Sequence, residues 1–463
     1  MKSKLLSLFI IFISILGCKT ERTDIITILD DLIKTEPSNS YYLYLRSEAH
    51  AHQENYSQSL IDIDQAIIIE PDSSHYHILK AEILSSIGKH DEAIKSFKNA
   101  LRNEPNQSQY LYYLAKELFY IGQNDSAQKS IEKALNLSEN PNLYALRAEI
   151  FLSQNKINEA IQDLNTALDI SNNIDFLYTR ASAYTTNEQY ELALSDLNHI
   201  LEKNKSHSDA LFLRALIYLN QDNYETAHLD FNALLSSKLK NNEDVILGSA
   251  LANLYLGNLE VANLKLNKLI RLKPEEAYFK YLRSMTQPVI CDAYDDLSKS
   301  LDIDPENVKY LYHRSTLECS QSKSTVACIN AGSVIKRTAW PPSAPQFWSN
   351  EPPIEREIPR SSFRPLCSDA LKDISLAIEL GLNSAHAFAL RGNIRKKLDD
   401  YRGAMIDYLE ATQIEPHNDE YFYQLARLQE RFGENISALS SYTKAMYPCR
   451  QVHLSLNKFR SLA

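Results

Sequence analysis

Glycine is scarce in this chain, with 10 glycines among 463 residues, about 2% against roughly 7% in average domains. No two glycines lie closer than Gly248 and Gly257, which are nine positions apart. Phosphate-binding loops of the GxGxxG and GxxxxGK types, and the GxSxG turn of α/β-hydrolases, need glycines at shorter spacing. The sequence therefore excludes these nucleotide-binding and hydrolase motifs.

Other patterns that carry chemistry are missing as well. None of the six cysteines forms a CxxC pair and no HExxH stretch occurs, so zinc-ribbon, thioredoxin and metalloprotease motifs are absent. The 49 basic residues are outnumbered by 59 acidic ones, for a net charge of -10, which disfavours the phosphates of a nucleic acid. We expect no enzyme, no cofactor, no metal site and no nucleic-acid partner.

The N-terminus resembles the export signal of a bacterial lipoprotein. Two lysines precede an apolar run from Leu5 to Leu16, which is shorter than the roughly 20 residues of a membrane-spanning helix. The run ends in Ile-Leu-Gly-Cys18, similar to a lipobox. The resemblance implies a signal peptide (1–17), lipid on Cys18 in a short tether (18–23), and, because Lys19 follows, the outer membrane where the cell has one. An ordinary secretory signal with a chance cysteine is the alternative.

A period of about 34 residues runs through most of the exported chain. Small residues recur at two positions of the period, usually twelve apart, where helices can approach closely, and a large apolar residue follows four residues after the second, a helical spacing. The first series of small residues is Ser47, Ala81, Ala115, Ala148, Ala181, Ala215, Ala250, Ser284, Ser315, Gly392 and Ala426. The second is Ser59, Ala93, Ala127, Ala160, Ala193, Ala227, Ala262, Ala293, Ala370, Ala404 and Ala438.

These residues resemble the tetratricopeptide repeat, whose signature places small residues at positions 8 and 20 and a large apolar one at 24. Eleven units fit from about Ser40 to Arg450, with a lone helix at Asp24–Thr35 and a short amphipathic tail at Val452–Leu462 as caps. The resemblance implies an all-α, right-handed superhelix of helical hairpins whose first helices line a concave groove for protein or peptide partners. We expect this array, with its N-terminal capping helix, over residues 24–318 and its continuation over 367–463.

A second pattern repeats in register with the first. Seven units carry Arg at position 7, and the same seven carry Asp at position 23, on the facing helix of the hairpin. Arginine and aspartate can pair across it, so we interpret them as structural ion pairs rather than as an anion-binding series. The expected pairs are Arg46–Asp62, Arg147–Asp163, Arg180–Asp196, Arg214–Asp230, Arg283–Asp296, Arg314–Asp373 and Arg391–Asp407.

An insertion interrupts the period inside repeat ten, at residues 319–366. It holds 7 of the 16 prolines and both tryptophans of the chain, which excludes a regular helix. Trp340, Phe347 and Trp348 are candidate partner contacts, because tryptophan is common as an interface anchor. A lid over the groove and an unstructured linker are the alternatives.

Cysteines concentrate around this insertion. An exported chain meets oxidising conditions in which disulfides form. Five cysteines remain after Cys18, so at least one thiol stays unpaired or bonds to another chain. A bridge from Cys328 or Cys319 to Cys367 would close the base of the insertion, and Cys291 lies at the equivalent turn one unit earlier.

Aromatic residues dominate position 5, which faces the groove in tetratricopeptide proteins. The candidate contact residues there are Tyr44, Tyr112, Tyr178, Phe212, Tyr281, Tyr312 and Tyr423. No strongly charged stripe is evident beside them. We expect a lipid-anchored, non-catalytic scaffold for protein or peptide partners in the cell envelope. A glycan-binding lipoprotein that stacks sugars on these rings, or an enzyme completed by the insertion, are the alternatives.

Overall fold

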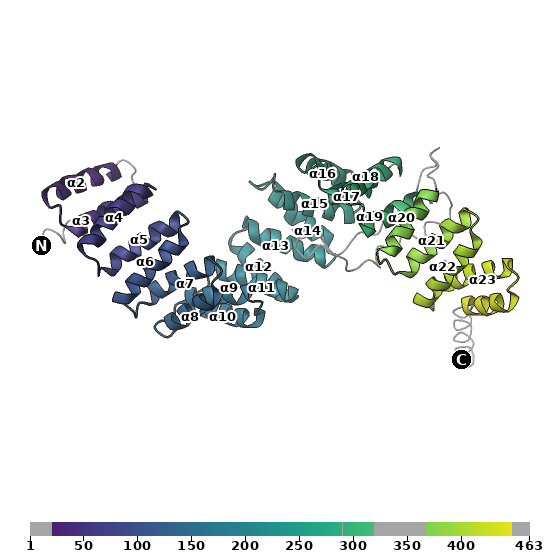
Figure 1. Cartoon of the computed structure of the whole chain (residues 1–463), viewed down its shortest axis with the longest axis horizontal. Coiled ribbons are helices and arrows are strands. Elements are labelled where there is room, and N and C mark those ends of the chain that lie inside the picture. Colours follow the sequence, from purple (N-terminus) through teal and green to yellow (C-terminus); the bar gives the residue numbers. More distant parts are fainter. Residues whose placement is uncertain (1–20, 289, 319–366, 447–463) are drawn as a thin grey trace. The chain divides into compact units, whose positions relative to one another are not determined.

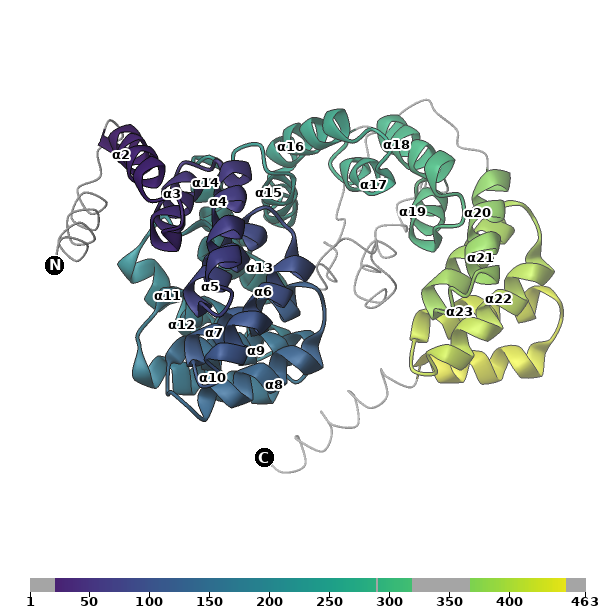
Figure 2. The same cartoon turned by 60° about the vertical axis from the view of Figure 1, so that its left-hand side comes forward.

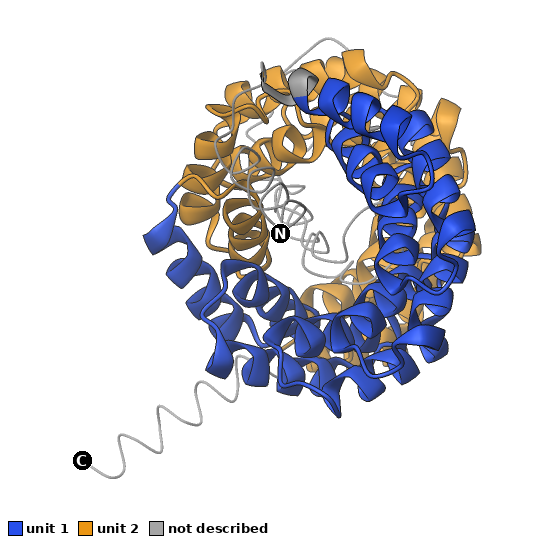
Figure 3. Ribbon diagram, turned by 90° about the vertical axis from the view of Figure 1, so that its left-hand side faces the viewer, with its two compact units in different colours: residues 1–205 blue, residues 206–463 orange. Residues whose placement is uncertain are grey.

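The computed structural model describes residues 21–288, 290–318 and 367–446. This part of the chain is helical and contains no strand. It forms two compact units, residues 1–205 and 206–463 (Figure 3). No helix in the described ranges is both long and apolar enough to cross a membrane. The fold is an all-helical array of tetratricopeptide-like hairpins.

Over residues 21–205, the described part of the first unit, a single helix precedes five hairpins (Figure 1). The single helix, α2, begins three residues before the helix predicted from Asp24. Each later pair packs as an antiparallel hairpin, and each hairpin packs on the next. The helices are α2 (Glu21–Thr35), α3 (Ser40–His52), α4 (Tyr56–Ile69), α5 (Ser74–Ser86), α6 (His90–Asn103), α7 (Ser108–Tyr120), α8 (Asn124–Leu135), α9 (Pro141–Ser153), α10 (Ile157–Ile170), α11 (Ile174–Thr186) and α12 (Tyr190–Lys203).

The described residues of the second unit form six hairpins in the same order of packing (Figure 2). The last helix described there covers residues 435–446. The others are α13 (Ser208–Asn220), α14 (Tyr224–Leu235), α15 (Glu243–Tyr255), α16 (Leu259–Leu272), α17 (Ala277–Ser284), α18 (Ile290–Ile303), α19 (Val308–Glu318), α20 (Cys367–Glu379), α21 (Ala385–Lys397), α22 (Tyr401–Ile414) and α23 (Asp419–Arg431).

The hairpin count corrects one detail of the sequence analysis. The insertion separates α19 from α20, and counting from α3 this hairpin is the ninth, not the tenth. The predicted signal peptide (1–17), the insertion itself and the C-terminal cap (Val452–Leu462) lie outside the described residues.

Small side chains explain how the two helices of a hairpin approach so closely. Ala81 and Ala93 are fully buried at the α5–α6 crossing. In the first hairpin, Ser47 and Ser59 replace them, and each hydroxyl donates to the other residue's carbonyl, at 2.8 and 2.7 Å. Burying two hydroxyls is tolerated because both are hydrogen-bonded.

The turn between the two helices needs a left-handed residue. Position 15 of the unit has positive φ in nine hairpins, and glycine adopts that conformation most easily. Four of the ten glycines stand there, including Gly88 (φ 78°) and Gly257 (φ 77°). Asn, Asp or Glu fill the position in the other five, which is how the chain folds with so little glycine.

Candidate functional site

The seven predicted Arg–Asp pairs are all hydrogen-bonded. In six of them, Nε and Nη2 of the arginine donate to the two carboxylate oxygens at 2.5 to 3.0 Å. In the seventh, Arg391 donates twice to Oδ1 of Asp407 and Arg395 donates to Oδ2 at 2.9 Å. The aspartate side chains are at most 9% exposed. Each arginine therefore has an internal counter-charge, which disfavours the anion-binding alternative.

Several of these arginines also join neighbouring hairpins. Nη1 of Arg283 donates to Asn267 at 2.6 Å, and Nη1 of Arg314 donates to Ser298 at 3.2 Å. Both acceptors lie at the same place on the second helix of the preceding hairpin. The guanidinium thus holds the hairpin together and fixes it on the preceding one.

The first helices of the N-terminal unit present an accessible face rich in tyrosine and glutamate. Its residues occupy positions 2, 5 and 9 of α3, α5, α7 and α9, and each is half-buried or exposed. We call it the tyrosine–glutamate face; it consists of Tyr41, Tyr44, Glu48, Ile78, Glu82, Tyr112, Lys116 and Glu149.

Tyr44 lies at the α3–α5 end of this face. Its ring stacks between Tyr41 and Tyr76, at centroid distances of 6.2 and 5.4 Å. Burial and the neighbouring charges of Glu48 and Glu82 raise the pKa of its hydroxyl. The ring therefore stays neutral beside two carboxylates.

The two glutamates next to Tyr44 lack a counter-charge of their own. Burial raises the pKa of Glu48, and His52 opposes this shift. Burial and the nearby charge of Glu48 raise the pKa of Glu82. Neither carboxylate forms an ion pair or hydrogen bond with another described residue. Two partly desolvated, mutually repelling carboxylates beside aromatic rings form a favourable environment for a cation.

At the other end of the tyrosine–glutamate face, on α7 and α9, a tyrosine again lies near a glutamate. Burial and Glu149 raise the pKa of Tyr112. Burial also raises the pKa of Glu149, and Lys116 opposes the shift. With three glutamates and one lysine, the tyrosine–glutamate face is acidic. This charge was not predicted from the sequence, although glutamate at position 9 in three of the first four units was a signal for it.

Two of the predicted contact residues in the second unit are core residues, which corrects the sequence analysis. Tyr281 is fully buried, and its ring lies 4.9 Å from that of Tyr310. Tyr312 is 5% exposed and packs in a cluster with Ile374 and Leu390 from the next helices. Neither ring is accessible to a partner.

The remaining position-5 aromatics have mixed surroundings. Tyr178 is half-buried, and Phe212 is half-buried with its ring edge-on to Phe231, at 6.2 Å. Tyr423 is 44% exposed and lies 6.0 Å from Tyr442. Four aromatic residues at position 5 were predicted contacts on described helices of the second unit. Of these four, Tyr423 alone is exposed.

Other predicted site residues lie beyond what the structure describes. Cys18, Cys319, Cys328, Trp340, Phe347 and Trp348 are outside the described ranges. Cys291 and Cys367 belong to α18 and α20, but their side chains are not described. Lipidation, the disulfide and the tryptophan contacts therefore stay predictions.

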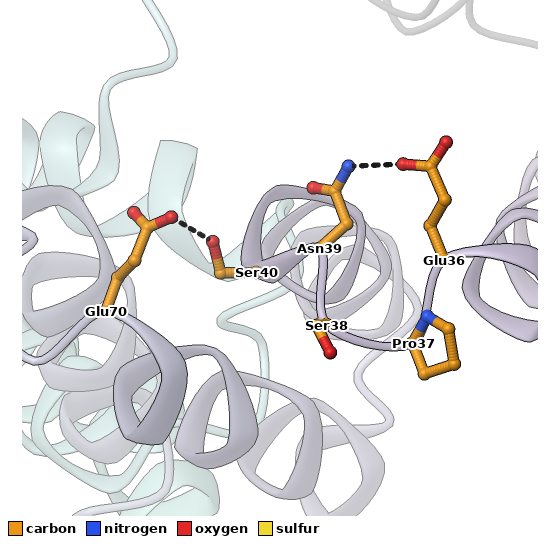
Figure 4. Close-up of a pocket in the computed structure, with 6 residues that line it drawn as sticks. All are labelled: Glu36, Pro37, Ser38, Asn39, Ser40 and Glu70. Carbon is orange, nitrogen blue, oxygen red and sulfur yellow. Dashed lines mark hydrogen bonds between the residues drawn. The ribbon is translucent and has the colours of Figure 1, made fainter.

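A surface depression lies between α2 and α3 in the described part of the N-terminal unit (Figure 4). Its polar groups satisfy one another, since Ser40 donates to Glu70 at 2.7 Å and Asn39 donates to Glu36 at 3.0 Å. Within the described ranges, no group of three or more His, Cys, Asp or Glu side chains is placed to hold a metal. The depression is an ordinary inter-helix turn.

Solved structures similar to the chain include three bacterial proteins. A tetratricopeptide repeat protein from Parabacteroides merdae is 21% identical, with 70% of this chain and 98% of that chain covered and a TM-score of 0.36. The C-terminal part of a repeat-containing protein from Cytophaga hutchinsonii is 16% identical, with coverages of 50% and 95% and a TM-score of 0.42. The pilF protein of Pseudomonas aeruginosa is 14% identical, with coverages of 45% and 96% and a TM-score of 0.40.

Two family models match parts of the chain. The N-terminal ARM repeat of tetratricopeptide repeat protein 21 matches residues 90–228, and the tetratricopeptide repeat matches residues 385–418. No curated protein matches the chain. The two models support the tetratricopeptide resemblance on both sides of the insertion.

Proposed function

We propose that the protein is a non-catalytic scaffold, held by lipid in a bacterial cell envelope, that binds a protein partner on its tyrosine–glutamate face. Repeats of this type typically serve as protein-binding scaffolds. The observation that carries the proposal is that Glu48 and Glu82, which form no ion pair or hydrogen bond with another described residue, both lie near the stacked Tyr44 ring.

The chemistry of the face favours an extended segment rich in lysine or arginine. A cationic side chain over the exposed ring of Tyr41 gains a cation–π contact, because the Tyr44 ring already stacks on Tyr41 and Tyr76. The same cation supplies the counter-charge that the two carboxylates lack, and the interaction is strengthened because the site is partly desolvated. A neutral sugar would gain only the stacking contact, so the glycan-binding alternative is less favoured.

The membrane attachment is a proposal that rests on the N-terminal sequence. Lipid on Cys18 would hold the acidic chain at a membrane that its own charge does not attract. The Cys18→Ala variant should lose fatty-acid labelling and stay uncleaved, while the repeat array folds normally. Equal labelling of variant and wild type would rule out the anchor.

The insertion is the second proposed contact. Trp340, Phe347 and Trp348 would anchor the partner beside the array, with specificity that the repeats alone do not supply. Replacing both tryptophans by alanine should then weaken partner capture without affecting the Arg314–Asp373 pair that closes the hairpin.

The test of the face is a partner pull-down from detergent-solubilised envelopes with matched variants. Tyr44→Ala and the double variant Glu48→Gln/Glu82→Gln should each reduce affinity for the captured partner by about tenfold or more. Two control variants change the same residue types outside the tyrosine–glutamate face. They are Tyr120→Ala, at a tyrosine that is 73% exposed, and Glu159→Gln on α10. Undiminished capture by both face variants would overturn the proposal.

A further inference from the structure

Four hairpins lack the Arg–Asp pair. In three of them, no charged side chain at positions 7 and 23 is left without a partner. In α5–α6, Lys80 replaces the arginine and pairs with Asp64 at 2.7 Å. The serines that replace aspartate in these three hairpins are hydrogen-bonded: Ser96 to the Glu92 carbonyl, Ser130 to the Ser126 carbonyl, and Ser441 to the Gln429 side chain.

The fourth, α15–α16, reverses the pattern. Serine stands at the arginine position (Ser249) and lysine at the aspartate position (Lys265). Ser249 is fully buried, and its hydroxyl has no hydrogen-bond partner. Lys265 is half-buried and forms no ion pair or hydrogen bond with another described residue. Burial and Lys268 lower the pKa of its ammonium group.

The register of the repeat places Ser249 and Lys265 at positions 7 and 23, which face each other across a hairpin. We call the space between these two positions the slot. In every paired hairpin, positions 7 and 23 meet through hydrogen bonds between the two helices, as Arg283 and Asp296 do in the next hairpin. In the paired hairpins the arginine side chains are 15 to 24% exposed, so there the slot reaches solvent along the hairpin edge. In α15–α16 the two positions hold neither an arginine nor a carboxylate, and the half-buried Lys265 side chain is the part that meets solvent.

We propose that Ser249 and Lys265 form a binding site for a carboxylate that comes from outside the hairpin. An ammonium group and an unpartnered hydroxyl are two donors without an acceptor, and a carboxylate has two oxygens that accept one bond from each. Elsewhere in the array the carboxylate is an internal aspartate. Here it would be an acidic side chain or C-terminus of a bound protein, or a small free carboxylate.

This site goes beyond the proposed function and lies in the other compact unit. The tyrosine–glutamate face belongs to residues 40–149 and selects cations, whereas the α15–α16 slot selects anions. Failure of either proposal therefore leaves the other standing, because the variants that test them do not overlap.

The experiment measures acylation of Lys265 in the full chain by a limiting amine-reactive reagent, read by peptide mass spectrometry. Chloride is replaced by acetate, phosphate or a glutamate-rich peptide at constant ionic strength. Acetate or the peptide should slow labelling of Lys265 about threefold once its concentration is twice the dissociation constant. Lys268 serves as the internal control and should react at an unchanged rate.

The two carboxylate sources separate in this design. Protection by acetate indicates a small-carboxylate site, and protection by the peptide alone, at equal carboxylate concentration, indicates an acidic protein segment. Either result supports the proposal. Labelling that no anion changes, protection by phosphate alone, or equal slowing of Lys268 overturns it.

A variant that rebuilds the standard pair gives the matched control. Ser249→Arg/Lys265→Asp supplies an internal carboxylate in the arrangement that seven other hairpins already use. Its melting temperature should not respond to acetate, whereas that of the wild type should rise. Ser249→Ala should keep its fold and lose part of the protection of Lys265. An equal rise with acetate in the wild type and the rebuilt variant would also count against the site.

Discussion

Tyr44 and Tyr281 occupy the same position of the repeat in the two compact units, yet only one of them meets solvent. Tyr44 is half-buried beside two unpaired carboxylates. Tyr281 is fully buried, with Tyr310 and His313 within 5.2 Å of its ring centroid. The same residue at the same register serves as surface in one unit and as core in the other.

Position 9 shows why the units differ. In the first unit it holds Glu48, Glu82 and Glu149, whose charges require water or a partner. In the second it holds Leu216 on α13, Leu251 on α15 and Met285 directly after α17, each 4% exposed. Apolar residues at this position let the neighbouring rings become core, because nothing polar must stay solvated. For Tyr44 and Tyr281 the exposure of position 5 thus follows the polarity of position 9, whereas Phe212 stays half-buried although position 9 of its helix is the buried Leu216.

The largest expected effect is a loss of stability, and it tests the contrast between Tyr44 and Tyr281. Tyr281→Ala should destabilise the second unit by about 3–5 kcal/mol, as for a fully buried aromatic ring. Tyr44→Ala should cost the first unit only about 1–2 kcal/mol, because part of its ring already meets water. Urea unfolding followed by circular dichroism gives the total, and hydrogen exchange of peptides from α17 and α3 assigns the loss to a unit. Equal losses at the two sites would contradict the contrast.

The Arg–Asp pairs, by comparison, should behave alike in both units. Arg180→Ala in the first unit and Arg214→Ala in the second each remove a partner from a pair of nearly identical exposure, 21% for each arginine and 8% and 7% for the aspartates. Each change should cost about 3 kcal/mol, near the lower limit for breaking a buried pair, because the arginine edges meet solvent.

Double-mutant cycles supply the control for these pairs. Arg180→Ala/Asp196→Ala and Arg214→Ala/Asp230→Ala should each be less destabilising than the sum of their single changes, since removing both charges leaves none buried alone. Strict additivity in one unit and coupling in the other would show that the shared pair is not equivalent across the chain.

A third prediction concerns how neighbouring hairpins pack in the two units. In the first unit, Phe97 stacks on Tyr113 of the next hairpin, with centroids 6.0 Å apart. At the equivalent place in the second unit, Phe231 lies against Gly248, and a Cβ on that glycine would overlap the phenyl ring. Gly248→Ala should therefore destabilise by about 1–3 kcal/mol through overpacking. Adding Phe231→Leu should recover part of the loss in thermal unfolding, and no recovery would mean that the overlap is not the cause.

The features predicted from the sequence were those fixed by spacing within one unit. Small residues at a crossing and oppositely charged residues on facing helices recur at a regular sequence distance, as Arg180 and Asp196 do, and five of the seven Arg–Asp pairs are 16 residues apart. The accessibility of Tyr281 or Tyr312 depends instead on side chains of adjacent hairpins. The unpaired state of Glu48 and Lys265 likewise depends on which neighbours lie across from them, and spacing alone does not give that information.

The smallest expected effect concerns the pH dependence of the tyrosine–glutamate face. Glu48 and Glu82 have raised pKa values in the folded chain, chiefly through burial, so their ionised forms oppose folding. This cost is present at neutral pH and disappears as the pH falls through the glutamate range, because the folded state takes up protons first. Glu48→Gln/Glu82→Gln should stabilise the first unit at pH 7 by a few tenths of a kcal/mol, given that Glu82 is exposed to solvent. The difference from wild type should vanish as the pH falls below the range of ordinary glutamates, whereas Glu159→Gln should show no such trend. Urea unfolding of all three proteins at several pH values measures it, and a double variant less stable than wild type at pH 7 would show that the two carboxylates have partners after all.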